Sequence, residues 1–232
     1  MIRCEHLNIG YGSRVIQHDL SFEIKARQLI ALLGANGCGK STLLRTLAGL
    51  QPTLAGAYSP VPNEKSVALV LTERLSVESA TVRDVVAMGR YPYTSFLGKL
   101  SAADHRIVDQ AMEQVGVREL ADTFYNDHSD GEKQRVLIAK ALAQQTPVIL
   151  LDEPTAHLDL PSRIKTLNLL HAIAHEQGKT ILISTHELDL ALRTADQVLL
   201  MFPKNEGILL DTPEHIRLTD AFTRAFGMEI LF

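Results

Sequence analysis

The sequence predicts an α/β protein whose core is a parallel sheet with helices on its faces. Short apolar runs, typical of strands buried on both faces of a sheet, occur at residues 29–33 and 148–151, and residues 180–184 predict a further buried strand. Helical patterns alternate with these runs, as expected for helices packed on a parallel sheet. A helical block between residues of about 75 and 145 interrupts the alternation, which indicates a helical subdomain inserted into the core.

The N-terminal region predicts short strands separated by turns, and we expect an antiparallel β region there. The predicted strands span residues 2–9, 14–24 and 28–33, and another strand spans residues 66–71. Residues 51–56 contain proline and glycine and break regular structure.

Helix-capping residues mark the starts of two helices in the helical block. Thr81 can cap one helix, and Ser101 can cap another in a capping box with Asp as the third residue after it. Later patterns predict helices over residues 162–175 and 187–194 and a strand over 197–202.

Length and composition favour one well-buried domain, residues 1–232. We expect residues 1–72 and 146–232 to form its core and residues 73–145 the helical subdomain. The net charge of -4 gives no general basic surface for nucleic acid, so we expect no nucleic-acid partner. No apolar run reaches the roughly 18–20 residues of a membrane helix, and the N-terminus has no signal-peptide core. We therefore expect a cytoplasmic protein that reaches a membrane only through a partner.

The stretch from Gly34 to Thr42 fits G-x-x-x-x-G-K-[ST], the phosphate-binding P-loop, between an apolar strand and a helical pattern. Glycines let backbone N–H groups point at phosphate, and the helix start adds partial positive charge. Lys40 adds a full charge, and the Ser41 hydroxyl can bind Mg²⁺. A glycine-rich turn without a ligand would not need this Lys-Ser pair. We expect nucleotide binding by Gly34, Asn36, Gly37, Cys38, Gly39, Lys40, Ser41 and Thr42.

Two interpretations of Cys38 are open. A helix N-terminus and a nearby lysine would favour its thiolate, in which case alkylation should block nucleotide binding. The simpler interpretation is a small residue that fills a variable loop position. The other cysteine is Cys4, and two cysteines do not make a disulfide framework.

Asp152 and Glu153 directly follow the apolar run 148–151. Ligands of open α/β sheets lie at the carboxyl ends of strands, so both carboxylates should lie beside the P-loop. Asp152 is suited to hold Mg²⁺ through a water molecule, and Glu153 can orient or deprotonate an attacking water.

Six features resemble the ATP-binding cassette (ABC) ATPases and follow that family's order, and the resemblance covers essentially the whole chain. The six features are Tyr11, the P-loop, Leu71-Thr72-Glu73 (like the Q-loop), Ser129 to Arg135 (like the signature motif), Asp152 to Asp159 (like Walker B and the D-loop) and Ser184 to Glu187 (like the switch-histidine region). The last three are more specific than the P-loop, which many families share.

The resemblance implies the ABC ATPase fold: a RecA-like P-loop NTPase core, an N-terminal antiparallel β region and an inserted α-helical subdomain. It implies ATP and Mg²⁺ as cofactors and a head-to-tail homodimer. By the resemblance, Tyr11 would stack on adenine. The implied catalytic residues are Lys40, Glu153 and His186, and the implied metal ligands are Ser41, Glu73 and Asp152. Ser129, Gly131 and Asp159 are further implied nucleotide-binding residues, and the anion site at Ser129 would serve ATP held by the other subunit.

The chain departs from the family pattern at two positions. Asp130 replaces a glycine of the signature motif, where its charge should repel a nearby γ-phosphate and weaken the closed dimer. Glu73 replaces the usual Q-loop glutamine, and its carboxylate could alter the affinity for the metal. Since Lys40, Asp152 and Glu153 are retained, we expect an active ATPase.

Residues 88–96 resemble the ATPase subunits of importers for iron–siderophore, haem and cobalamin. The resemblance implies two transmembrane permease subunits, an indirect substrate-binding protein partner, and a peripheral place on the inner face of the cell membrane. Two alternatives remain open: a soluble ABC ATPase and a regulatory nucleotide-binding module with little turnover.

His171 and His175 stand at i and i+4 of one predicted helix and could in principle bind a metal. No third ligand is apparent in the sequence, and the helix otherwise has an amphipathic pattern.

Overall fold

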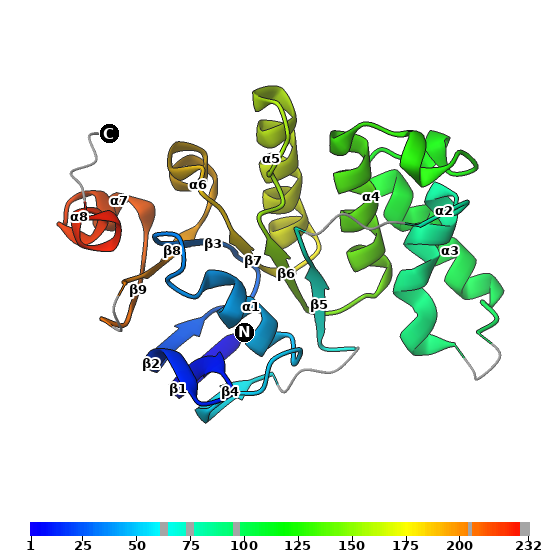
Figure 1. Cartoon of the computed structure of the whole chain (residues 1–232). Helices are drawn as coiled ribbons and strands as arrows, with labels where there is room; N and C mark the ends of the chain where they lie inside the picture. The colour runs from blue at the N-terminus through cyan, green and yellow to red at the C-terminus, as the bar shows by residue number, and fades with distance from the viewer. Residues whose placement is uncertain (61–64, 73–76, 95–97, 204–205, 228–232) are drawn as a thin grey trace.

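A six-stranded sheet forms the centre of the computed structural model, which describes residues 1–60, 65–72, 77–94, 98–203 and 206–227 (Figure 1). The strand order is β5-β6-β7-β3-β8-β9, and only the pair β8–β9 is antiparallel. The strands are β3 (Leu29–Leu33), β5 (Val67–Val70), β6 (Val148–Asp152), β7 (Thr180–Ser184), β8 (Gln197–Met201) and β9 (Ile208–Asp211).

The central sheet is buried because apolar side chains alternate between two hydrophobic cores. Strand β3 is buried at all five positions. Its residues Leu29, Ala31 and Leu33 face one core, which includes helices α5 (Leu160–Glu176) and α6 (Leu188–Thr194). Its residues Ile30 and Leu32 face the other core, which includes helix α1 (Lys40–Leu47).

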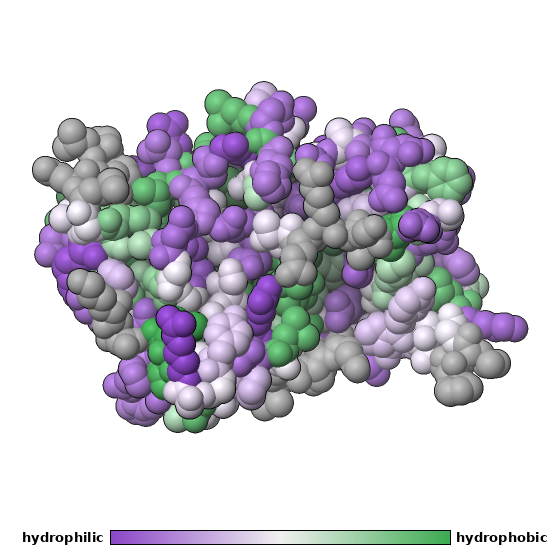
Figure 2. All heavy atoms as spheres, in the orientation of Figure 1, coloured by the Kyte–Doolittle hydropathy of each residue, from purple (hydrophilic) through white to green (hydrophobic). Residues whose placement is uncertain are grey.

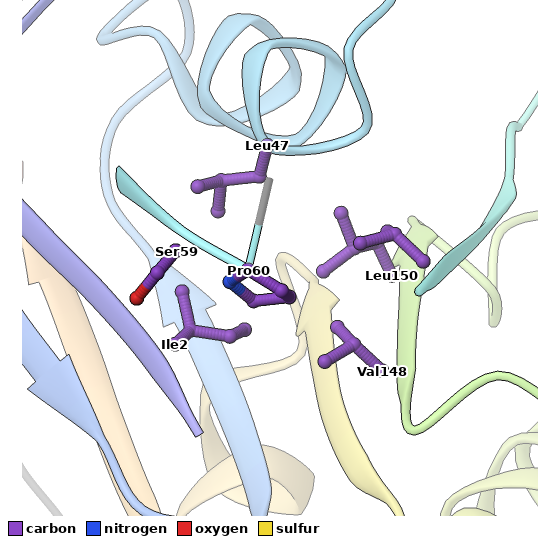
Figure 3. Close-up of a pocket in the computed structure, with 7 residues that line it drawn as sticks. Ile2, Leu47, Ser59, Pro60, Val148 and Leu150 are labelled. Atoms are coloured by element: carbon purple, nitrogen blue, oxygen red, sulfur yellow. The ribbon is translucent and has the colours of Figure 1, made fainter. Parts of the chain in front are cut away.

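A second sheet of order β2-β1-β4 covers the far side of α1, so that α1 lies between the two sheets (Figure 1). Its antiparallel strands are β1 (Ile2–Tyr11), β2 (Arg14–Ile24) and β4 (Ala55–Ser59). Figure 3 shows apolar side chains of both sheets and α1 converging on one small space, which is too small to hold a water molecule. These contacts fix α1, and therefore the loop before it, against the central sheet.

The helices α2 (Val82–Ala87), α3 (Ala102–Gln114) and α4 (Asp130–Ala143) lie together beside the sheet, with α5 between them and α6 (Figure 1). The 3-10 helices η1 (Met88–Tyr93), η2 (Arg118–Leu120) and η3 (Tyr125–Asp127) connect them. The predicted caps Thr81 and Ser101 are confirmed, and each forms a complete capping box. The last described elements are α7 (Pro213–Arg217) and α8 (Ala221–Phe226), which lie beside β8.

Residues 51–54 lie outside regular structure as expected, but β4 begins at Ala55, so the last two residues of the predicted break, 55 and 56, belong to a strand. This strand is mostly exposed and reads Ala-Gly-Ala-Tyr-Ser, so it has little apolar signal. It is held by backbone pairing with β1.

Hydrophobic side chains on the face shown in Figure 2 form small patches, which are separated by hydrophilic side chains.

In the described part of the chain, each helix is too short or too polar to cross a bilayer.

A buried ion pair joins η1 to α3. Arg90 is 4% exposed; its Nε donates to Asp104 Oδ1 at 2.9 Å and its Nη1 donates to the Ala143 carbonyl at 2.7 Å. Hydrogen bonds from Ser101, and then the Arg90 guanidinium, lower the pKa of Asp104 from 3.8 to about 2. The stability that this ionised carboxylate contributes is therefore present above about pH 4 and is lost as the pH falls towards 2.

Arg90→Ala should destabilise the protein by about 3–5 kcal/mol, because the buried Asp104 carboxylate loses its only cationic partner in the described structure and keeps only its hydrogen bonds from Ser101, and the Ala143 carbonyl loses its bond from the guanidinium. The thermal midpoint should fall by about 6–20 °C. The control is Arg118→Ala, which removes a half-exposed ion pair with Asp109 worth less than about 1 kcal/mol. Equal midpoints for the two variants would contradict the structural role of Arg90.

Candidate nucleotide-binding site

The loop between β3 and α1 takes the shape of a phosphate cradle because two glycines adopt backbone angles that other residues avoid. Gly34 has φ 152°, and a Cβ there would lie 2.5 Å from the Met201 carbonyl oxygen. Gly39 has φ 112° and directly precedes the first residue of α1. The loop therefore leads the free N–H groups of the α1 N-terminus towards one point.

A cavity of about 420 Å³ opens at this loop. The Lys40 side chain reaches back across the loop, and its Nζ donates to the carbonyls of Gly34 at 2.8 Å and Ala35 at 3.3 Å. A phosphate bound in the loop would compete for this buried ammonium group. The lining residues are Ile16, Asn36, Gly37, Gly39, Lys40, Ser41, Thr42, Glu153 and His186.

The Ser41 hydroxyl donates to Asp152 Oδ1 at 3.1 Å, so the two oxygens lie close together at the end of β6. Neighbouring oxygens in an octahedral Mg²⁺ site lie about 2.9 Å apart, given metal–oxygen distances of 2.0–2.1 Å. The donor set of hard oxygens and this spacing fit Mg²⁺. Ser184, opposite Asp152 in the register of β6 and β7, donates to the same Oδ1 at 2.6 Å and fixes the carboxylate.

Glu153 points into the cavity because the chain turns sharply at this residue. Its φ is +50°, an uncommon value for a residue other than glycine, and its N–H is held by the Ser184 hydroxyl at 2.9 Å. Its carboxylate lies 2.5 Å from Nε2 of His186, which follows β7. A carboxylate and an imidazole in contact at the mouth of a phosphate site can together position a water and a phosphoryl oxygen.

The buried Gln17 side chain braces the loop from β2. Its Nε2 donates to the carbonyls of Cys38 at 3.0 Å and Phe202 at 2.7 Å. Cys38 is itself buried, and burial raises the pKa of its thiol more than the nearby Lys40 lowers it. Of the two interpretations of Cys38, burial therefore favours the simpler one, in which Cys38 is a small buried residue beneath Gly34.

Tyr11 lies at the end of β1, with 44% of its surface exposed. Its hydroxyl accepts a hydrogen bond from Thr42 at 3.3 Å, which ties it to α1. Ile16, rather than Tyr11, is the side chain before the P-loop that lines the cavity.

Ser129, Gly131 and Asp159 form a second group that does not line this cavity. Ser129 begins α4 and Asp159 begins α5, as helix caps. A Cβ on Gly131 would lie 3.4 Å from Ser162 Oγ, so the two helix starts are adjacent. The structure thus separates the predicted site residues into a P-loop group and a signature group on the same chain.

Glu132 is a residue whose local role the sequence analysis missed. Its Oε2 accepts hydrogen bonds from the Ser129 hydroxyl at 2.6 Å and from the Ser129 N–H at 3.0 Å. These two hydrogen bonds have the largest influence on the pKa of Glu132, and they lower it. The S-x-x-E spacing of a capping box was the signal that could have found it.

Polar contacts connect helix α5, which follows Glu153 in the chain, with Glu187, the residue after His186. Arg163 forms an ion pair with Glu187, and its Nε donates to the Leu158 carbonyl at 2.7 Å. The sequence offers no local pattern for this contact, which depends on the packing of α5 beside α6.

The structure brings together the predicted residues Lys40, Ser41, Asp152, Glu153 and His186 around one cavity. Glu73, predicted as a metal ligand, lies outside the described residues, as do Ser95 and Phe96 of the importer-like segment. Two further side chains hold the site in place: Ser184, named from the sequence only as the start of the switch-histidine-like region, and Gln17, which the sequence analysis did not assign.

The pattern of the ABC transporter family matches residues 17–156. Among curated relatives, the iron(3+)-hydroxamate import ATP-binding protein FhuC of Bacillus subtilis is 40% identical, covering 82% of this chain and 74% of its own. The ferric enterobactin transport ATP-binding protein FepC of Escherichia coli is 32% identical, covering 99% and 88%.

Solved structures agree with this assignment. An ABC transporter described as of the metal-chelate type, in an inward-facing conformation, matches with a TM-score of 0.89 at 30% identity, covering 98% of this chain and 89% of its own. The structure of cbiO1 from Clostridium perfringens, part of the ABC transporter complex cbiONQ, matches with a TM-score of 0.82 at 28% identity, covering 96% and 92%. The described chain has the fold of the ABC ATPases, and it belongs to the family of ABC transporter ATP-binding proteins.

Proposed function

We propose that this chain is the ATP-hydrolysing subunit of an importer for a metal chelate such as an iron–siderophore, haem or cobalamin. The observation that carries the proposal is the convergence of Lys40, the Ser41–Asp152 pair and the Glu153–His186 pair on one cavity. The import direction and the substrate class rest on relatives that carry out hydroxamate and enterobactin transport.

In the proposed site, Lys40 and the α1 N-terminus bind the phosphates, and Tyr11 stacks on the base. Ser41 and Asp152 would hold Mg²⁺, with Glu73 as a third oxygen ligand; the ion would neutralise charge on the phosphates. Glu153 accepts the proton of the attacking water. His186 donates a hydrogen bond to the γ-phosphate, which requires it to turn from Glu153.

The signature group needs a second copy of the chain, since Ser129, Gly131 and Asp159 do not line the cavity of their own P-loop. In a head-to-tail homodimer, these residues would meet ATP held by the other copy. ATP would close the dimer, and hydrolysis would release it.

The partners we propose are two permease subunits in the membrane and, through them, a substrate-binding protein; nucleic acid is not among them. The chain would then lie on the inner face of the cell membrane. The core of residues 1–72 and 146–232 would close on ATP, and the subdomain of residues 73–145 would transmit that movement to the permease.

The substrate class can be tested by uptake in cells. Deletion of the gene should abolish ATP-dependent accumulation of one radiolabelled chelate from a panel of ferric siderophores, haem and cobalamin. The wild-type chain should restore uptake, and the Glu153→Gln variant should not. Normal accumulation of every chelate in the deletion strain would contradict the importer role and favour a soluble ATPase or a regulatory module.

Asp130→Gly should raise ATP-driven dimerisation and the ATPase rate. Asp130 is half-buried in the first turn of α4. Burial raises the pKa of Tyr125, and the negative charge of the Asp130 carboxylate raises it further. A like charge about 6 Å from the γ-phosphate costs on the order of 1–3 kcal/mol at an intermediate dielectric. Its removal should therefore strengthen the closed dimer by about 5- to 150-fold. Light scattering with ATP and a phosphate-release assay measure both effects.

The matched control for Asp130→Gly is Asp130→Asn, which removes the charge and keeps the size of the side chain. Both variants should shift dimerisation in the same direction if charge is the cause. No change, or a fall, in both would contradict this account of the signature motif.

A further inference from the structure

Two histidines and an aspartate form a cluster away from the nucleotide cavity. His171 and His175 lie on one face of α5, near its C-terminal end, and Asp196 directly precedes β8. The sequence showed no third ligand for the histidine pair because Asp196 lies 21 residues beyond His175, and only the fold brings it there. We propose that His171, His175 and Asp196 bind a divalent transition-metal ion of the Zn²⁺ type.

The spacing of the three side chains is close to that of a metal site. One ligand atom from each residue lies within 4.8 Å of the other two. His175 Nε2 lies 3.1 Å from both carboxylate oxygens of Asp196, and His171 Nε2 lies 3.9 Å from Oδ1. Ligand atoms of a tetrahedral Zn²⁺ site lie about 3.3 Å apart, given bonds of 2.0–2.1 Å. To reach this spacing, the ligand atoms of the partly exposed imidazole rings need to move closer to the other ligand atoms by no more than about 1.5 Å.

The backbone of β3 holds the carboxylate in the orientation that such a site requires. Leu29 N–H donates to Asp196 Oδ2 at 2.7 Å, and Asp196 N–H donates to the Leu29 carbonyl at 2.9 Å. Oδ1 is left facing the two histidines. Hydrogen bonds of this kind orient the ligands of known metal sites and support their affinity.

The donor set selects the class of ion. Two imidazoles and one carboxylate suit Zn²⁺ and its neighbours, whereas Mg²⁺ prefers an all-oxygen set. Three protein ligands leave a fourth position for water or for a group on a partner. Leu29 begins β3 and the P-loop follows its far end, so the two sites lie about 15 Å apart. The ion is therefore separate from the Mg²⁺ of the nucleotide site.

The test is a Zn²⁺ titration of the nucleotide-free, chelator-treated protein by calorimetry, with equilibrium dialysis to count bound ions. The test variants are His171→Ala and Asp196→Asn; the latter keeps an oxygen that can accept from Leu29. The control is His215→Ala, an exposed histidine 2.5 Å from Asp211, a pair to which the described residues bring no third ligand.

Wild type and His215→Ala should bind one more Zn²⁺ ion per chain than either test variant. Loss of an outer-shell partner costs about 10- to 100-fold in affinity, so loss of a ligand should cost about 100-fold or more. Zn²⁺ at a hundred times its dissociation constant should raise the thermal midpoint of wild type by about 5–10 °C. Because the stoichiometry of each variant is compared with that of wild type, any ion bound at Glu153 and His186 cancels in the difference.

Equal stoichiometry and affinity in all four proteins would overturn the proposal and leave the cluster as an ordinary His–Asp ion pair. Thermal unfolding in chelator checks that each variant is folded. If the His171→Ala variant is not folded, the test uses Co²⁺ added to wild type and to Asp196→Asn. A difference between their visible spectra supports the site, and identical spectra overturn it.

Discussion

Glu153→Gln should lower ATP hydrolysis by about 100- to 10,000-fold, the range expected when a general base is removed. The carboxylate lines the phosphate cavity, 2.5 Å from His186, and the left-handed backbone at Glu153 fixes its direction. Glutamine keeps the shape and loses the ability to accept a proton. ATP affinity should stay within a few-fold of wild type, so ATP-bound dimers should accumulate. Phosphate release, nucleotide binding and light scattering measure these three results.

The control for this prediction is Glu214→Gln, which changes an exposed carboxylate on α7 in the same way. Its hydrolysis rate should equal that of wild type. A Glu153→Gln variant that hydrolyses ATP at the wild-type rate would remove Glu153 from the mechanism. Rates near zero in wild type and in both variants would instead favour a module with little turnover.

Lys40→Met should weaken ATP binding by about 10- to 150-fold, because a hydrogen bond to a charged group contributes about 1.5–3 kcal/mol. The Lys40 ammonium is buried in the loop, where it donates to the Gly34 and Ala35 carbonyls, and a bound phosphate can replace these partners. Methionine keeps the aliphatic stem, so packing against the loop should survive. Equilibrium binding of a fluorescent ATP analogue measures the affinity.

The matched control is Lys25→Met, which removes an exposed lysine just after β2. Its affinity for ATP should equal that of wild type. If Lys40→Met and Lys25→Met bound ATP equally well, the cavity at the P-loop would not be the nucleotide site.

The parallel strands could be predicted from sequence because each is a short, buried apolar run. The strands β6 and β7 appear within one residue of their predicted bounds, since most of their buried positions carry apolar residues. The edge strand β4 could not be predicted, because an exposed strand is stabilised by backbone pairing and carries no apolar pattern.

The candidate site divides in the same way. The P-loop and the Asp152-Glu153 pair are contiguous in sequence, so their chemistry could be predicted from local pattern and from their place at strand ends. The roles of Ser184 and Gln17 depend on which strands are neighbours and on their register, which one sequence does not supply. Asp196 was missed as a partner of His175 for the same reason.

Local pattern left two interpretations of Cys38 open, and its burial favours one of them. The position of Cys38 before a helix and a lysine suggested a thiolate, but the thiol is buried beneath the loop, and burial has the larger effect on its pKa. The segment 88–96 was interpreted only by resemblance, whereas its Arg90 is a buried structural residue that joins η1 to α3.

The importer role is tested most directly by recovery of the tagged chain from detergent-solubilised native membranes, followed by quantitative mass spectrometry. We expect a multi-spanning permease in about the same molar amount as this chain, retained by the Glu153→Gln variant because binding does not need hydrolysis. Recovery of the chain from the soluble fraction alone, with no membrane protein above the level of an untagged control, would contradict the account.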